Sequence, residues 1–176
     1  MRLLLLLFLS IELMALSIDP LLLKAQASIF PKIMLLDNDI SIKTTDKKLV
    51  FSIIHTDSER KIAQKLKELI DNEYANKLGE LNLETRLSNI KDFDGKEDAA
   101  AYYIFDASSA KMKDVVSHAE LTHRICFGYN YKDFDKNVLV SLFLKEKTYI
   151  YLNKSALQEY QIKFTPIFYR IAKVVE

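Results

Sequence analysis

The stretch between residues 99 and 130 organises the predicted fold, because its pattern of apolar and polar positions predicts a strand, a short loop, a helix and a second strand. Residues 102–105 are a nearly continuous run of aromatic and β-branched side chains, which is typical of a strand buried on both faces of a parallel sheet. Asp and Ser at 106–109 suit a helix start, and residues 124–127 resume the apolar run. A strand–helix–strand unit of this length predicts a βαβ crossover and therefore an α/β fold.

Three earlier stretches extend this pattern. Residues 49–54 are a second apolar run and predict another buried strand. Residues 58–74 place apolar side chains at helical spacing, with an acidic residue near the start as the helix dipole prefers. Residues 81–90 alternate between apolar and polar side chains, which indicates a half-exposed strand towards a sheet edge.

The segment before these strands predicts a helix followed by a loop. Residues 18–36 have helical spacing, and Pro20 suits the first turn. Pro31 is expected to kink this helix or to end its first segment. The polar stretch 37–48 is expected to be a loop with a short strand at 40–42.

The C-terminal third predicts a hairpin and two helices. Residues 138–144 and 148–152 are apolar runs separated by a short charged turn, which is typical of an antiparallel hairpin at a sheet edge. Asn153 is expected to cap a short helix over 154–159. Thr165 and Pro166 are expected to start a final helix that runs to Val175.

These elements together predict one domain over residues 18–176, and a chain of 176 residues fits a single domain. The expected fold is an α/β three-layer sandwich with helices on both faces of its sheet. The sheet is expected to be mostly parallel, with about five to six strands and an antiparallel C-terminal hairpin.

Residues 1–17 predict a secretory signal peptide and hence export to the periplasm. A basic Met1-Arg2 precedes the unbroken apolar run 3–9, and Ala15-Leu16-Ser17 offers small residues of the kind that a signal peptidase reads. Small residues recur at 25–27, so cleavage after residue 27 is the second possibility. The alternative is an uncleaved inner-membrane anchor that tolerates Glu12.

Composition excludes several classes of function. The net charge of +1 argues against a nucleic-acid-binding surface. Three glycines and three prolines leave no flexible linker and no glycine-rich phosphate loop.

The single cysteine, Cys126, cannot form an intramolecular disulfide. It either pairs between chains or is a buried thiol within a strand, and we favour the buried thiol.

No catalytic or metal-binding motif is present. The sequence contains no P-loop, GxGxxG, GxSxG or HExxH pattern. His118 and His123 are five residues apart, which places them on different faces of a helix, and no cysteine or carboxylate cluster completes a metal set. We therefore expect a protein that is not an enzyme and that needs no cofactor or metal.

Polar residues that follow the predicted strands form a candidate ligand-binding rim. Open α/β sheets bind ligands beyond the carboxyl ends of their strands, and helix N-termini there can hold an anion. The rim would consist of His55, Asp57, Ser58, Asp106, Ser108 and Ser109. The alternative, which we favour, is that these residues are mainly helix caps.

Three aromatic residues in the stretch 129–136 suggest a second kind of site. Tyr129, Tyr131 and Phe134 alternate with charged residues. Exposed aromatic residues dominate the binding energy of many interfaces, so this cluster is a candidate partner-binding surface. The alternative is a lid folded onto the core.

The chain resembles the YfiR-like family of periplasmic proteins. The similarity is closest over residues 139–175, where an apolar strand, a charged turn, a strand ending in Asn153 and a final segment ending Ile-Ala-Lys-Val-Val resemble the family's C-terminus. Residues 24–36 resemble its first helix, and 102–109 and 125–127 fit its central strands. The chain has Asp135-Lys136-Asn137-Val138 where the family often has a glycine pair, and it lacks the cysteine pairs of redox-sensitive members.

This resemblance implies a non-catalytic periplasmic regulator. Its expected partner is the periplasmic sensor part of an inner-membrane diguanylate cyclase or histidine kinase, whose output it would modulate. The sequence also leaves open whether the protein forms a homodimer. The alternative function is a periplasmic binding protein for a small ligand of the anion or amino-acid type, with the rim as its site.

Overall fold

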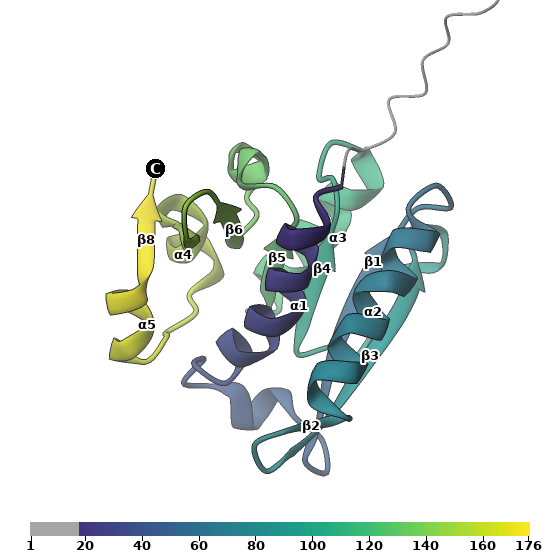
Figure 1. The fold of residues 1–176 in the computed structure, drawn as a ribbon, viewed down its shortest axis with the longest axis horizontal. Coiled ribbons are helices and arrows are strands. Elements are labelled where there is room, and N and C mark those ends of the chain that lie inside the picture. The colour runs from purple at the N-terminus through teal and green to yellow at the C-terminus, as the bar shows by residue number, and fades with distance from the viewer. Residues whose placement is uncertain (1–17) are drawn as a thin grey trace, which may run out of the picture.

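Eight strands form one sheet in the computed structural model, which describes residues 18–176 (Figure 1). The predicted signal peptide over residues 1–17 lies outside the described residues. The strands are β1 (Lys48–His55), β2 (Lys77–Leu78), β3 (Leu81–Asn89), β4 (Ala101–Ile104), β5 (Ile125–Gly128), β6 (Val140–Leu144), β7 (Thr148–Asn153) and β8 (Ala172–Val175). Their order across the sheet is β2-β3-β1-β4-β5-β6-β7-β8.

The sheet is mostly parallel, as the sequence predicts. The strands from β3 across to β6 pair in parallel, and so do β7 and β8. The antiparallel pairs are β6 with β7, which is the predicted C-terminal hairpin, and the short β2 with β3. The buried strands coincide with the apolar runs, because residues buried on both sheet faces leave no positions for polar side chains.

Helices cover both faces and complete the predicted three-layer α/β sandwich. The helices are α1 (Pro20–Met34), α2 (Arg60–Tyr74), α3 (Ala110–Leu121), α4 (Lys154–Tyr160) and α5 (Pro166–Ile171), with shorter 3₁₀ helices η1 (Ile40–Lys43), η2 (Ile90–Asp92) and η3 (Tyr131–Lys136). α1 and α2 pack on each other in front of the sheet, and α3 lies behind it against α4 (Figure 1). None of the helices within residues 18–176 combines the length and the apolar character needed to cross a bilayer.

Aromatic rings fill the centre of the front layer. The ring of Phe30 on α1 stacks on that of Phe127 on β5, with centroids 4.4 Å apart. Phe51 on β1 meets Phe127 edge to face at 5.7 Å, and all three side chains are fully buried. Such pairs add about 0.5–1.5 kcal/mol beyond their buried area, so they hold α1 firmly against the sheet.

The prediction of five to six strands was too low, and the C-terminal helix prediction was partly wrong. α5 starts at Pro166 as expected but ends at Ile171, and Ala172–Val175 continues as β8 beside β7. The helical spacing of apolar residues here is overridden by pairing with the neighbouring strand, which suits the two β-branched valines. The predicted hairpin is therefore not the sheet edge, because β8 lies outside it.

Two predictions about the segment before β1 were also wrong. Pro31 does not end the first helical segment, since α1 continues past it to Met34; a proline near the helix end interrupts only the last turn. The expected strand at 40–42 is part of η1 instead. Asp37 turns the chain there: one carboxylate oxygen accepts a 2.9 Å hydrogen bond from the backbone N–H of Asp39, and the other accepts from Lys43 at 2.5 Å.

The connections define the place where such sheets bind ligands. β1 leads through α2 to β3 on one side, whereas β4 leads through α3 to β5 on the other. The carboxyl ends of β1 and β4 therefore lie at the topological switch point of the sheet. His55 ends β1 there, and the predicted rim residues follow these two strands.

Candidate functional site

A cavity of about 690 Å³ lies at the carboxyl ends of β1, β3 and β4. We call it the rim cavity, and it is lined by Thr56, Asp57, Ser58, Ile90, Lys91, Ser109, Ala110 and Lys111. It brings together three of the six predicted rim residues, Asp57, Ser58 and Ser109. The loop before α2 and the start of α3 line this cavity, and the two helices lie on opposite faces of the sheet (Figure 1).

Asp57 joins two of the loops around the rim cavity. Its carboxylate accepts a hydrogen bond of 2.7 Å from the side-chain amide of Asn89 and a second one from Lys91. The hydrogen bond from Lys91 is the main reason why the pKa of Asp57 lies below its usual value, and that from Asn89 adds to it. Asp57 is thus ionised and already partnered at neutral pH.

The predicted capping of α2 by Asp57 and Ser58 was wrong. The residue at the N-cap position is Glu59, and its carboxylate accepts hydrogen bonds of 2.8 and 2.9 Å from the backbone N–H and the hydroxyl of Thr56. The hydroxyl of Ser58 lies 2.9 Å from that of Thr56, and Ser58 is exposed. Ser58 is therefore a rim residue with a hydroxyl that a ligand could reach.

The capping interpretation is confirmed at the start of α3. The hydroxyl of Ser109 accepts from the backbone N–H of Met112, and the carboxylate of Asp106 accepts both the backbone N–H and the hydroxyl of Ser108. Asp106 and Ser108 form this turn outside the lining of the rim cavity. His55 is buried, and its Nδ1 lies 2.9 Å from the carbonyl oxygen of Thr56.

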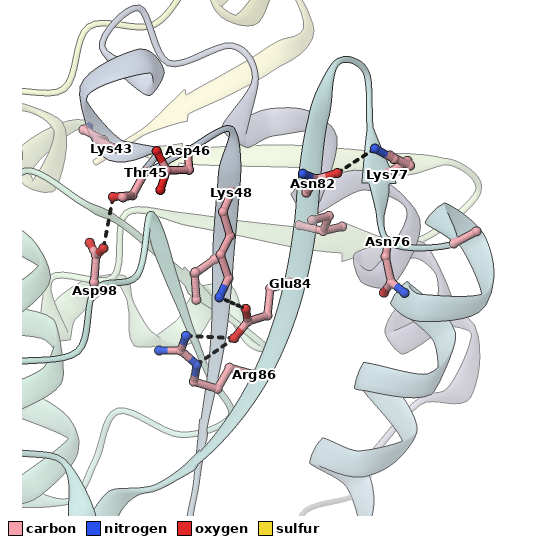
Figure 2. A pocket seen from close by; sticks show the side chains of 13 residues that line it. Lys43, Thr45, Asp46, Lys48, Asn76, Lys77, Asn82, Glu84, Arg86 and Asp98 are labelled. Carbon is pink, nitrogen blue, oxygen red and sulfur yellow. Dashed lines mark hydrogen bonds and ion pairs between the residues drawn. The ribbon is translucent and has the colours of Figure 1, made fainter.

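A second cavity, of about 640 Å³, lies at the opposite end of the sheet, where β1 and β3 begin (Figure 2). Its lining mixes charges of both signs, and Figure 2 shows Lys48, Glu84 and Arg86 side by side on adjacent strands. On the far side of the cavity, Lys77 donates a hydrogen bond of 2.6 Å to the side-chain oxygen of Asn82. Sequence reasoning missed this cavity.

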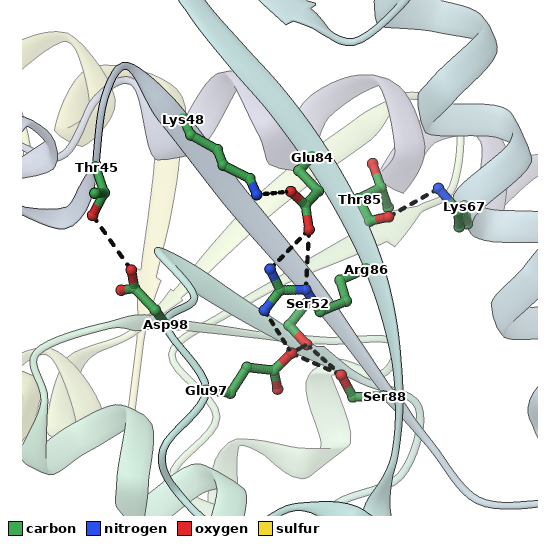
Figure 3. Close-up of polar contacts among 10 residues, drawn as sticks. All are labelled: Thr45, Lys48, Ser52, Lys67, Glu84, Thr85, Arg86, Ser88, Glu97 and Asp98. Carbon is green, nitrogen blue, oxygen red and sulfur yellow. Dashed lines mark hydrogen bonds and ion pairs between the residues drawn. The ribbon is translucent and has the colours of Figure 1, made fainter.

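Three charged groups of this second cavity, Lys48, Glu84 and Arg86, satisfy one another (Figure 3). The carboxylate of Glu84 accepts from Lys48 and from two nitrogens of Arg86, at 2.8 and 3.1 Å. These hydrogen bonds, with that from Lys48 the strongest, lower the pKa of Glu84. We interpret the group as a structural network that joins β1 to β3.

Glu97 extends this network behind the sheet. Its carboxylate accepts hydrogen bonds from Ser52 at 2.8 Å and Ser88 at 2.7 Å, and Arg86 lies 3.6 Å away (Figure 3). The chain from η2 to β4 is thereby fastened across β1 and β3. The sequence holds one signal for it, since Glu84, Arg86 and Ser88 alternate on the polar side of the predicted strand.

The structure separates the three predicted partner-binding aromatics. Tyr129 is buried, and its hydroxyl accepts a hydrogen bond of 2.7 Å from the backbone N–H of Asp19. Phe134 is half-buried and packs against the core. Tyr131 is the exposed member of the three, at 37%. The lid interpretation therefore fits Tyr129 and Phe134, whereas Tyr131 stays available to a partner.

Tyr131 belongs to a different aromatic group on the C-terminal hairpin. We call it the aromatic cluster, and it consists of Tyr131, Phe143, Tyr149 and Tyr151. The ring of Tyr131 meets those of Phe143 and Tyr151 edge to face, at 5.2 and 5.6 Å between centroids. Phe143 and Tyr151 stack at 5.8 Å across the β6–β7 pair. Phe143, Tyr149 and Tyr151 are all partly exposed.

Beside this cluster the sheet ends in an apolar edge. Four exposed large apolar side chains follow one another in α5 and β8: Ile167, Tyr169, Ile171 and Val174, with 42–52% of their surface exposed. We call these four side chains and the outer side of β8 the C-terminal edge surface. All four lie within α5 and β8, and exposed apolar residues that gather in one segment at a sheet edge suggest an interaction site.

Two other candidate groups lead to no site. Within residues 18–176, no three His, Cys, Asp or Glu side chains are grouped so that they could hold a metal ion. Cys126 is fully buried on β5, as the sequence favours, and burial raises the pKa of its thiol to about 12.

No protein-family model and no curated protein matches the chain. Its fold is similar to that of a conserved domain protein from Vibrio cholerae, with a TM-score of 0.61 and 11% identity, over 88% of this chain and 60% of that one. It is also similar to an ABC domain in complex with L-Trp from Streptococcus pneumonia, with a TM-score of 0.52 and 10% identity, over 83% of this chain and 61% of that one. The chain thus spans about three fifths of each structure, and at these identities the similarity shows the fold alone.

Proposed function

We propose that this protein is a non-catalytic periplasmic regulator. It binds the periplasmic sensor part of an inner-membrane diguanylate cyclase or histidine kinase and changes the output of that receptor. The observation that carries the proposal is the C-terminal edge surface, with its four exposed apolar side chains beside an open strand. This surface lies within residues 139–175, the segment whose sequence most resembles the YfiR-like family.

The composition of this surface favours a protein partner. Burying one exposed aliphatic or aromatic side chain gains about 1.5–3 kcal/mol when it becomes fully enclosed. Ile167, Ile171 and Val174 are each about half exposed, so a partner that covers them gains part of that energy from each. Tyrosines such as Tyr131 and Tyr169 are enriched at interfaces because their rings are large and their hydroxyls stay hydrated.

Binding of this kind is sufficient for regulation. A receptor with two conformations shifts towards the one that its ligand binds more tightly, by an amount set by the difference in affinity. A regulator that binds one state ten times more tightly than the other shifts the free-energy difference between the two states by about 1.4 kcal/mol. No chemistry by the regulator is required.

The proposal is tested by deleting the gene and measuring cellular cyclic-di-GMP and the phosphorylation of envelope histidine kinases. We expect the deletion to change one of these outputs and the wild-type gene to restore it. Ile171→Asp should fail to restore the output, because a charge would lie within the interface. Leu121→Asp is the matched control, since Leu121 is 78% exposed at the end of α3, away from the C-terminal edge surface. An unchanged output in the deletion strain under every envelope stress would contradict the proposal.

A second candidate function is favoured by the rim cavity. Its position at the switch point is where open α/β sheets hold small ligands, and it exposes the hydroxyl of Ser58 beside Lys91 and Lys111. One structure of similar fold is described as a complex with L-Trp. The ligand would be an anion or an amino acid.

A thermal-shift screen of the purified protein against inorganic anions and the amino acids tests this second function. A ligand that binds only the folded state raises the melting temperature in a saturable way. Lys111→Glu should abolish the shift, whereas Lys113→Glu, a matched exposed lysine on the same helix, should keep it. A screen with no saturable shift would remove this candidate.

A further inference from the structure

The C-terminal edge surface has an open hydrogen-bonding side. β8 is the last strand of the sheet and pairs with β7 alone. Natural sheets protect their edges by short strands or by charged side chains. The opposite edge follows this rule, because β2 has two residues. β8 is longer, with four residues; Lys173 is its one charged side chain, and Val174 on it is 49% exposed.

From this edge we propose that the outer side of β8 receives one extended strand of the partner protein, in which acidic residues alternate with apolar ones. The inference rests on the proposed regulatory function and specifies its mode of binding. Strand addition gains affinity from main-chain hydrogen bonds and specificity from alternate side chains. The two faces of β8 define those alternate side chains.

One face of β8 carries the cation of Lys173, followed on the same face by Val175. The register pairs Lys173 with Tyr151, which places Lys173 on the same face as the aromatic cluster. Its ammonium group lies 3.9 Å from the ring centroid of Tyr149, and that of Lys147 lies 5.3 Å from the same ring. The β6–β7 turn adds Lys145 and one acid, Glu146. Lys173 lies on β8 itself, so it favours a carboxylate opposite it on this face of an added strand.

The other face of β8 is apolar. Val174 is paired with Leu152, and Ala172 with Ile150. Ile171 precedes this face with 52% of its surface exposed. Successive residues of a strand point to opposite faces, so a strand that satisfies both faces of β8 alternates acidic with apolar side chains.

Charge argues for a different protein rather than a second copy of this chain. Antiparallel pairing of two β8 strands about Lys173 would place two lysines directly opposite each other, which is destabilising. Pairing about Val174 would place Lys173 opposite Val175. Glu176, the nearby acid, is paired with Lys154 at 2.5 Å. Self-pairing therefore leaves the lysines without carboxylates.

The test uses the exported protein and two synthetic peptides, one of alternating glutamate and valine and one of alternating lysine and valine. We expect the glutamate peptide to bind and to slow amide hydrogen exchange in β8, and the lysine peptide to bind at least tenfold more weakly. Lys173→Glu should reverse this preference, since the charge opposite the peptide is then negative. Lys113→Glu on α3 is the control that should leave the preference unchanged. Equal binding of both peptides, or no binding of either, would overturn the proposal.

The same exchange measurement, made with the periplasmic domains of the cyclases and kinases responsible for the output that the gene deletion changes, separates this inference from the proposed function. Binding with protection of β8 supports both. Binding with protection elsewhere overturns strand addition and leaves the regulatory function standing. No binding to any of these domains contradicts the regulatory function itself. Protection of β8 that depends on the concentration of the protein alone would identify a homodimer and overturn the inference.

Discussion

The hydroxyl of Tyr103 on β4 donates a hydrogen bond of 2.7 Å to the side-chain oxygen of Gln26 on α1. Both side chains are fully buried. The amide nitrogen of Gln26 donates in turn to the backbone carbonyl of Tyr129 at 2.9 Å, just after β5. One glutamine thus ties α1 to two central strands, and these directional contacts fix the position of the helix more tightly than apolar packing alone would.

The first prediction concerns this glutamine. Gln26→Ala leaves the hydroxyl of Tyr103 and the carbonyl of Tyr129 buried without their partner, so we expect the free energy of unfolding to fall by about 2–4 kcal/mol. Urea denaturation followed by circular dichroism measures the change. Gln64→Ala on α2 makes the same substitution at an exposed position and should change stability by less than about 0.5 kcal/mol. Equal stability of the two variants would contradict the structural role of Gln26.

The second prediction concerns the N-terminal boundary of the folded domain. Cleavage after residue 27 would remove Leu23, Gln26 and Ala27, all of which are buried. We expect a chain that starts at Ile18 to unfold cooperatively and a chain that starts at Ser28 to show no cooperative transition. Thermal denaturation of both chains measures this. A cooperatively folded chain from Ser28 would contradict the packing of α1 and would make cleavage after residue 27 tenable.

The central crossover could be predicted from the sequence because its signals are local and agree with one another. The apolar run 102–105 is typical of a strand with two covered faces, and Ser109 caps α3 five residues after β4 ends. The same holds for the C-terminal hairpin and for Asn153, which caps α4 by accepting from the backbone N–H of Ala156 at 3.3 Å. Strand, cap and helix follow in sequence order, so no distant contact is needed to infer them.

The end of the chain and much of the site depend on distant contacts. Residues 172–175 can be read as helix or strand, and their parallel pairing with β7 decides between them. Glu84 lies opposite Val50 because of the β1–β3 register, which brings it to Lys48 and Arg86. No spacing within the sequence reveals that register. The rim was predicted only in part. The sequence shows which residues follow a strand, but the direction of each side chain depends on contacts with distant parts of the chain.

The third prediction concerns Cys126. Burial raises the pKa of its thiol to about 12, so the reactive thiolate is scarce at neutral pH and reagents cannot reach the sulfur. We expect no labelling by iodoacetamide in the native protein at pH 8 and complete labelling in urea, as measured by mass spectrometry. A disulfide-linked dimer on a non-reducing gel of the native protein would contradict this and would revive pairing between chains.

The last prediction concerns His118, which lies beneath the segment between η2 and β4. Its ring meets those of Phe93 and Tyr102 edge to face, at 5.5 and 5.7 Å between centroids. Burial, together with the positive charge of Arg124, lowers its pKa below 6.5, while Glu97 opposes this shift. The folded state therefore favours the neutral imidazole.

The sign of the pH dependence follows from this shift. Between the lowered pKa of the folded state and the ordinary value near 6.5, the unfolded chain binds more protons, so stability rises with pH in that window. The contribution of His118 is fully present above about pH 6.5 and is lost as the pH falls through the folded pKa. His118→Phe keeps an aromatic ring against Phe93 and Tyr102 but removes the titration. We expect the stability of the wild type relative to this variant, measured by urea denaturation from pH 7.5 to pH 5, to decline as the pH falls; a constant difference would show that His118 titrates alike in the folded and unfolded states.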